Sequence, residues 1–116
     1  MSTKIVGTTI NHTRSDTLQL VVSLTKDGAD YECADGDTCR FAMKKKYTDA
    51  IPLINKDMAC RGNSAYLELD PSDTANLDTG KYVYDIEITT ADGVVDTVIP
   101  PDPTEDAYFV LGKEVY

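Results

Sequence analysis

One long alternating stretch that ends in an Asp-Gly pair constrains the fold of this chain more than any other feature. Its alternate positions hold apolar side chains, namely Tyr82, Tyr84, Ile86 and Ile88. A period of two is typical of a β-strand with one buried face. The Asp92-Gly93 pair that follows predicts a hairpin with a type I′ turn, which needs a positive φ at both central residues. We therefore expect a long central strand, a tight turn and a returning strand.

Most of the remaining chain alternates in the same way. The predicted strands cover residues 17–25, 38–46, 65–69, 94–99 and 107–116, with inward side chains that include Leu18, Leu20, Val22, Leu24, Cys39, Phe41, Met43, Ala65, Leu67 and Leu69. A weaker strand over residues 51–58 contains Pro52, which lacks a backbone N–H, so we place this strand at a sheet edge. Asp70 followed by Pro71 predicts a short capped helix that crosses toward the central strand. The prolines of residues 100–106 predict an interruption of pairing before the last strand.

These elements predict the fold class. About seven to nine short strands with one short helical crossing are typical of an all-β sandwich or barrel. The chain has 116 residues, which is a usual size for one domain and enough to bury a core. We therefore expect a single domain over residues 1–116.

Net charge argues against nucleic acid as a partner, and the lack of long apolar runs argues against a membrane. The formal net charge is -9 and the pI is about 4.3, so the field of the protein repels nucleic acid. The one basic cluster is Lys44–Lys46. No apolar run approaches the roughly 20 residues that span a bilayer, and residues 1–7 lack the apolar core of a signal peptide. Neither a nucleic acid nor a membrane is expected as a partner.

The cysteines give a prediction about the redox environment. Three of them, Cys33, Cys39 and Cys60, cannot all pair within one chain. Their spacing matches neither a zinc finger nor a redox Cys-x-x-Cys motif. Cys33 and Cys39 flank a turn and could bridge if oxidised, but a reduced intracellular environment is the simpler interpretation. Cys39 alternates with Phe41 and Met43, so we expect it in the core.

The acidic segment 30–37 raises the question of calcium. A calcium loop has ligands at positions one, three and five and a glycine at position six. Aligning Gly36 with that glycine places Asp35, Cys33 and Tyr31 at the ligand positions, and only Asp35 can bind the ion. We therefore expect a solvated acidic turn rather than a metal site.

Candidate catalytic groups do not meet the geometry that catalysis requires. His12, Ser15 and Asp16 are neighbours in one loop, whereas the members of a triad converge from different elements. Asp85 and Glu87 lie on one face of the central strand, about 7 Å apart by the strand rise. Glycosidase carboxylates instead face each other across a cleft. We expect no enzyme activity and no cofactor.

The stretch Asp78–Tyr84 resembles the entry to strand F of immunoglobulin-like domains. There an Asp precedes a Tyr whose hydroxyl bonds back to upstream backbone, an arrangement called the tyrosine corner. By this resemblance Tyr82 is the corner tyrosine, with Asp78 ahead of it. Tyr84 stands where antibody domains place a disulfide Cys, and the chain contains no Trp. The resemblance therefore implies an Ig-like antiparallel β-sandwich outside the antibody family.

A second resemblance covers the latter half of the chain. Its features are a strand at residues 67–69, a crossing at residues 71–77, the strand Gly80–Ile88, the Asp92-Gly93 hairpin and a last strand. This order resembles Ig-like phage and prophage structural proteins, and it is similar to the N-terminal domain of phage baseplate upper proteins. The acidic insert at residues 30–37 and the break at residues 100–106 depart from that pattern.

The second resemblance implies a non-enzymatic building block of a tail or baseplate. Such a protein is assembled in the host cytoplasm, resides in the virion, forms homo-oligomers and contacts other virion structural proteins. Its working surfaces are sheet edges and termini, because exposed edges pair with neighbours. The candidate contact residues are Ile5, Val6, Tyr108, Val110, Val115 and Tyr116.

Three other functions stay open. A carbohydrate- or cell-surface-binding module would present an exposed aromatic platform, for which Tyr31, Tyr47 and Tyr66 are candidates. A small enzyme would need a cleft with perturbed titratable groups. An acidic mimic of nucleic acid would bind a DNA-handling protein through its net charge of -9.

Overall fold

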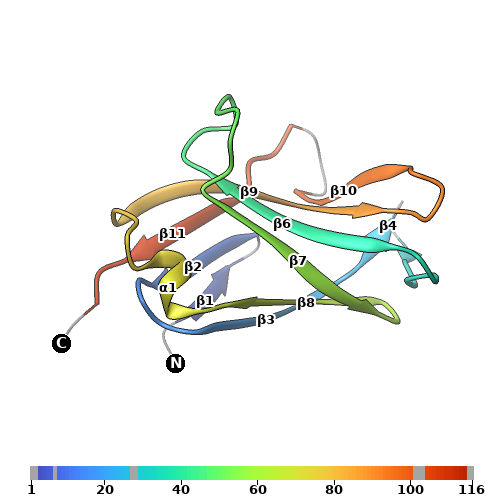
Figure 1. The fold of residues 1–116 in the computed structure, drawn as a ribbon, viewed down its shortest axis with the longest axis horizontal. Coiled ribbons are helices and arrows are strands. Elements are labelled where there is room, and N and C mark those ends of the chain that lie inside the picture. Colours follow the sequence, from blue (N-terminus) through green and yellow to red (C-terminus); the bar gives the residue numbers. More distant parts are fainter. Residues whose placement is uncertain (1–2, 7, 27–28, 101–103, 115–116) are drawn as a thin grey trace.

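The computed structural model describes residues 3–6, 8–26, 29–100 and 104–114. This part of the chain is mostly β-structure with one short helix (Figure 1). The strands are β1 (Thr3–Val6), β2 (Thr9–Thr13), β3 (Leu18–Ser23), β4 (Thr25–Lys26), β5 (Ala29–Asp30), β6 (Thr38–Lys44), β7 (Ile54–Arg61), β8 (Ser64–Leu69), β9 (Gly80–Thr89), β10 (Val95–Ile99) and β11 (Tyr108–Gly112). The helix α1 covers Pro71–Thr74. The expected all-β class is confirmed.

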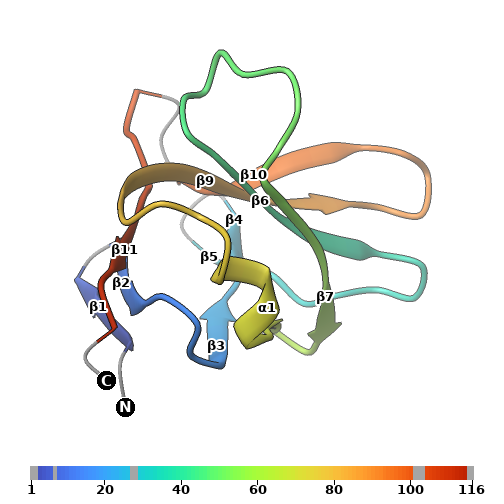
Figure 2. The same cartoon turned by 60° about the vertical axis from the view of Figure 1, so that its left-hand side comes forward.

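The main sheet is a long curled path. Its strands follow the order β1-β2-β11-β9-β6-β7-β8-β3, and β10 pairs with β9 beside this path. The strand β7 joins the two halves, because residues 54–58 pair with β6 and residues 59–61 pair with β8. The sheet therefore turns back on itself, and β3 and β8 lie across from β9 and β6 in a nearly barrel-shaped arrangement (Figure 1, Figure 2).

The predicted central strand, β9, lies at the centre of the sheet. On one side it pairs with β6 through residues 83–89. On the other side residues 80–83 pair with β11 and residues 86–89 pair with β10. The expected interruption before the last strand is therefore confirmed. One pairing departs from the antiparallel expectation, since β11 runs parallel to β2.

The alternating side chains form one core. Those that are nearly or fully buried include Leu18, Val22, Leu24, Cys39, Phe41, Met43, Ala65, Leu67, Leu69, Tyr82, Tyr84, Ile86 and Ile88, all of which the alternation places inward. The ring of Phe41 lies 5.5 Å from that of Tyr84 and 6.2 Å from that of Phe109. Burial of side chains of this size stabilises the fold by roughly 1.5–3 kcal/mol each. Leu20 is the exception, because it is only half-buried.

The helical crossing is fastened to its surroundings by polar contacts. The backbone N–H of Asp70 donates to the carboxylate of Asp73 at 2.7 Å, and Lys56 of β7 forms an ion pair with the same carboxylate at 3.1 Å. The Thr74 side chain is fully buried, and its hydroxyl oxygen accepts the N–H of Ser15 at 2.8 Å. The crossing is thereby held against both β7 and the β2–β3 turn.

The expected type I′ turn after β9 is wrong. Gly93 has a φ of 90°, but Asp92 has no positive φ, so only one residue is left-handed. Thr90 donates its N–H to the carbonyl of Val94, and Gly93 donates its N–H to the carbonyl of Thr90, both at 2.9 Å. This is the longer hairpin loop in which a left-handed glycine follows the turn.

The predicted edge strand over residues 51–58 has described pairing on one side only, because residues 54–58 pair with β6 and pairing with β8 begins at Ala59. The strand β7 begins only at Ile54, and it lies between β6 and β8. Pro52 belongs to the connecting loop, where Leu53 donates its N–H to the carbonyl of Met43 at 2.8 Å. The proline therefore removes no donor from the ladder, which is why its strand does not need a free edge.

Tyr82 makes the bond that a tyrosine corner requires. Its side chain is 3% exposed, and its hydroxyl donates to the backbone carbonyl of Asp78 at 2.5 Å. The Nζ atom of Lys45 lies 4.6 Å above the centre of the ring. The turn ahead of β9 is thereby fixed to the strand itself.

We expect Tyr82→Phe to lower the free energy of unfolding by about 1–2 kcal/mol, because the Asp78 carbonyl loses its donor. Urea unfolding followed by circular dichroism measures the change. Tyr66→Phe is the control, since Tyr66 is 42% exposed, and it should change stability by less than about 0.5 kcal/mol. Equal effects of the two substitutions would contradict the structural role given to the corner bond.

Candidate functional site

The residues predicted to make contacts lie in different places. Tyr108 and Val110 are half-buried in β11, which is flanked by β2 and β9 and has no free edge. Lys81 places its Nζ atom 4.3 Å above the Tyr108 ring. Ile5 and Val6 belong to β1, at one end of the sheet path.

For β1 the structure shows the antiparallel backbone pairing with β2. Val115 and Tyr116 lie outside the described residues. A contact role for any of the six candidates stays a prediction.

Near Tyr82, at one end of the core, polar contacts of Arg14 join segments that are distant in sequence. Arg14 donates through Nη1 to the carbonyl of Leu77 at 3.1 Å and forms an ion pair with Glu114, with Nη2 and Oε1 2.6 Å apart. The hydrogen bonds from Arg14 hold the pKa of the Glu114 carboxyl below its usual value. This constellation ties the segment after β11 to the crossing, so it acts as a fastening.

The possible triad does not form. His12 is 2% exposed, its Nε2 lies 3.0 Å from the carbonyl of Asp16, and its ring packs edge-on against Phe109 with centroids 6.0 Å apart. Ser15 has a φ of 68° and turns its backbone N–H toward Thr74. A nucleophile must lie within hydrogen-bond reach of its base, but the Ser15 side chain hydrogen-bonds to Glu114.

The acidic segment is a closed turn. Asp37 accepts hydrogen bonds from the hydroxyl of Tyr31 at 2.5 Å and from the N–H of Ala34 at 2.9 Å, and these bonds lower the pKa of its carboxyl. Within the described ranges no three His, Cys, Asp or Glu side chains come together as a metal site would need.

The expected reduced state is wrong for two of the three cysteines, whereas Cys33 and Cys39 are not bridged to each other, as expected. Cys33 is bonded to Cys60, with Cα atoms 6.1 Å apart, and it does not pair with Cys39. The N–H of Cys33 also donates to the carbonyl of Gly62 at 2.7 Å. Folding of the β7–β8 hairpin brings Cys60 beside residues 31–37, a contact that spacing along the chain cannot reveal.

The third cysteine lies in the core as expected. Cys39 is free and 2% exposed. Burial raises the pKa of its thiol to about 11, so the reactive thiolate is scarce at neutral pH. Cys39 therefore serves packing rather than chemistry.

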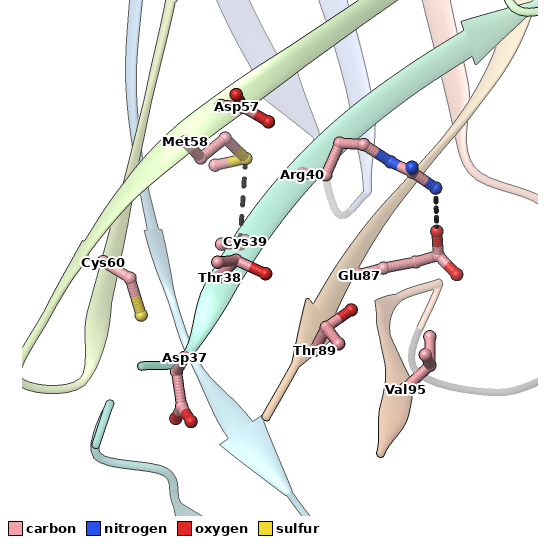
Figure 3. A pocket seen from close by; sticks show the side chains of 10 residues that line it. All are labelled: Asp37, Thr38, Cys39, Arg40, Asp57, Met58, Cys60, Glu87, Thr89 and Val95. Carbon is pink, nitrogen blue, oxygen red and sulfur yellow. Dashed lines mark hydrogen bonds and ion pairs between the residues drawn. The ribbon is translucent and has the colours of Figure 1, made fainter. Parts of the chain in front are cut away.

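A polar hollow of about 580 Å³ lies on the outer face of the sheet, over β6, β7 and β9. Arg40 is the register partner of Asp57 on one neighbouring strand and of Glu87 on the other. Figure 3 shows its guanidinium turned toward Glu87, and their Nη2 and Oε1 atoms are 2.7 Å apart. Thr38 and Thr89 complete the polar side of the hollow.

This hollow lacks the parts of an active site. Its lining side chains provide no nucleophile with an adjacent base, and Glu87 is neutralised by the ion pair. Asp85 lies two residues before Glu87 on the same face of β9. Burial raises the pKa of the Asp85 carboxyl, and the nearby charge of Glu87 raises it further. The hollow is a charged sheet face, and Asp85 and Glu87 are both half-buried, which differs from the solvated strand face expected for them.

The free edge of β3 is the most unusual feature of the described surface. Residues 18–23 pair with β8 on one side, and no described strand pairs with β3 on the other. Beside this edge lies a slot of about 230 Å³ between the two halves of the sheet, whose lining includes Ile10, Leu20, Val22, Tyr84, Ile86 and Ile99. Leu20 points inward but stays half-buried, because no further strand covers it.

The outer strand β10 carries features that discourage pairing, whereas the described strand β3 does not. The register of β10 is irregular between Thr97 and Ile99, and the strand carries Asp96. The run Thr17–Thr25 contains no charged residue, although 27% of the whole chain is charged. Charges, prolines and bulges are the usual means by which proteins prevent edge-to-edge pairing, so β3 is open to another strand.

Exposed large apolar side chains of the described residues gather in three places, one of which is the pair Val94 and Val95 at the start of β10. Val21 of β3 is 59% exposed and lies opposite Tyr66 of β8 on the outer face. The loop between β6 and β7 exposes Tyr47, Ile51 and Leu53.

The predicted aromatic platform does not assemble. Tyr31 bonds to Asp37, and the Tyr47 hydroxyl accepts the N–H of Ala107 at 3.0 Å. Tyr66 faces outward from β8 in a different hollow from Tyr47. The three tyrosines thus come from separate parts of the chain, and Tyr47 and Tyr66 line different hollows of the described surface.

Sequence reasoning missed the edge of β3. The signal was present, since residues 17–25 are uncharged in a strongly acidic chain. The alternation predicted a strand there, but it did not predict which side of that strand lacks a neighbour.

Comparisons with known proteins give no relative from which a function could be transferred. No family model, no curated protein and no solved structure matches this chain. Among the helices of the described ranges, none has the length and apolar character to cross a membrane. The edge of β3 and its slot are therefore the features of the described surface from which a function can be proposed.

We expect the Cys33–Cys60 bond to be detectable by counting thiols. Unfolded, unreduced protein should take up one maleimide, on Cys39, and reduced protein should take up three. The double variant Cys33→Ser/Cys60→Ser should lose about 3 kcal/mol of unfolding free energy, as expected for a loop closed over 27 residues. Three labels without reduction would overturn the bond.

Proposed function

We propose that this protein is a non-enzymatic assembly module whose working surface is the open edge of β3. The observation that carries this proposal is an uncharged, unprotected strand edge beside an apolar slot. Strand addition at such an edge satisfies main-chain hydrogen bonds and places alternate side chains in the slot. The lining of the polar hollow around Arg40 gives no comparable support for a catalytic function.

The finer fold that we propose is Ig-like. Three features support it: the β3–β8 pair faces the strands β2, β11, β9 and β6, a short helix precedes β9, and Tyr82 bonds back to Asp78. The parallel β2–β11 pair and the strand β7, which belongs to both halves, make it a variant of that sandwich in which the two halves form one curled sheet.

We further propose that the assembly is a phage or prophage tail or baseplate. This rests on the resemblance of residues 67–93 to Ig-like virion structural proteins. The Cys33–Cys60 bond fits a particle that is assembled in the host cytoplasm and oxidised after release, because disulfides persist on virion surfaces. Its partners are then other virion structural proteins and further copies of itself.

Particle purification tests the virion proposal. Prophage induction of the source bacterium, density-gradient separation and peptide mass spectrometry should find this chain in the particle fraction at a fixed ratio to tail proteins. A host cytoplasmic protein of similar size is the control for contamination. Presence of the chain only outside the particles contradicts the virion proposal.

A second candidate function is carbohydrate binding on the outer face of β3 and β8. A hollow of about 500 Å³ there brings Tyr66 together with Gln19, Asp57 and Glu68. An exposed aromatic ring with neighbouring polar groups can stack a sugar and bond its hydroxyls.

A glycan array tests this second function. Binding should be specific for one sugar class and should disappear in Tyr66→Ala, while Tyr108→Ala, on a different strand, should keep it. Absence of any glycan signal, or equal loss in both variants, contradicts it.

A further inference from the structure

The edge strand has a pattern that reads the same in both directions. From Thr17 to Thr25 the order is Thr-Leu-Gln-Leu-Val-Val-Ser-Leu-Thr. About Val21, each apolar residue has an apolar counterpart and each polar residue a polar one. A strand with this pattern is complementary to itself when it runs antiparallel, because an isologous interface needs the same surface on both subunits.

We infer that the edge of β3 binds the β3 edge of a second copy of this chain, antiparallel, about a twofold axis through Val21. This inference rests on the proposed function, since it names the partner of the same edge. In this register Leu20 lies opposite Val22 of the second copy. The pairing would continue the sheet from one subunit into the next.

The inner face gives the first reason for this register. Leu18, Leu20 and Val22 point toward the core, and Leu20 is left half-buried at the slot. The register with Val21 on the axis keeps inward side chains opposite inward side chains, whereas a shift by one residue would place them opposite outward-facing ones. The paired Leu20 and Val22 side chains would then cover the open side of the slot.

The outer face gives the second reason. Ala59, Tyr66 and Val21 are successive register partners across β7, β8 and β3, so they form one cross-strand row. Val21 and Tyr66 are 59% and 42% exposed. With Val21 opposite its own copy, the row continues across the axis, and apolar cross-strand pairs of this kind stabilise a sheet.

The net charge of the chain gives a reason to expect pairing at this strand rather than elsewhere on the surface. Each copy carries a net charge of -9, so two copies repel over most of their surfaces. The run Thr17–Thr25 brings no charges into contact. Added salt screens the long-range repulsion, so we expect the dimer to become tighter as ionic strength rises.

Sedimentation velocity and light scattering of the purified chain, from about 1 µM to 1 mM, test the pairing. The wild-type chain should pass from monomer to dimer within this range and should associate more strongly in higher salt. Val21→Lys should weaken the dimer about tenfold or more, because two like charges then lie directly opposite each other. Val95→Lys is the matched control, since Val95 is a 55% exposed valine on the irregular strand β10, and it should dimerise like the wild type.

Cross-linking tests the register itself. Val21→Cys should form a disulfide-linked dimer under mild oxidation, because the two substituted residues lie opposite each other across the axis. Gln19→Cys should stay monomeric, because Gln19 lies opposite Ser23 of the second copy and about 13 Å from its own counterpart. Both variants retain the Cys33–Cys60 bond and the buried Cys39.

The outcomes separate this inference from the proposed function. A strict monomer at every concentration, a dimer that Val21→Lys leaves intact, or equal cross-linking of both cysteine variants would overturn the twofold pairing. If the chain is nevertheless found in purified particles, the assembly role stands and the edge receives a strand of a different protein. If the dimer forms in this register but the chain is absent from purified particles, the twofold pairing is supported and the virion role is contradicted.

Discussion

The hydrogen-bonded ladder along β9 is the interaction on which the rest of the structure depends. This strand pairs with β6 on one side and with β11 and β10 in succession on the other. Its inner face supplies buried residues from Tyr82 to Ile88, and the Tyr82 hydroxyl fixes the turn that precedes it. The strands nearest the C-terminus are thus positioned by a segment earlier in the chain, and β2 joins the sheet through β11.

The curl of the sheet determines where the strand path ends and which described strand edge stays unpaired. Because β7 passes from β6 to β8, the path returns toward its own beginning and ends at β3. The Cys33–Cys60 bond and the Arg14–Glu114 pair fasten segments distant in sequence. The side of β3 next to the slot lacks such a fastening. An apolar, uncharged edge in an otherwise acidic molecule is therefore where the fold is most able to accept another chain.

Sequence reasoning succeeded where the chemistry is local. The alternation around Tyr82, Phe41 and Leu67 predicted the inward faces correctly, because side chains on a strand point to opposite sides in turn. It failed where the answer depends on distant residues. Cys60 gave no sign of lying beside Cys33, and the alternation gave no sign of which side of β3 lacks a neighbour. The Asp92-Gly93 turn is a local error, because only Gly93 is left-handed.

The all-β class, most of the core side chains and the absence of charge from Thr17 to Thr25 follow from the order of the amino acids. Which strands are neighbours, which edge stays open and which two cysteines meet depend on how the chain folds as a whole. The physical reason is that a strand carries its side-chain period within itself, whereas its hydrogen-bonding partners come from elsewhere in the chain. Leu20 illustrates both, since its inward direction follows from the alternation and its partial exposure follows from the missing neighbour of β3.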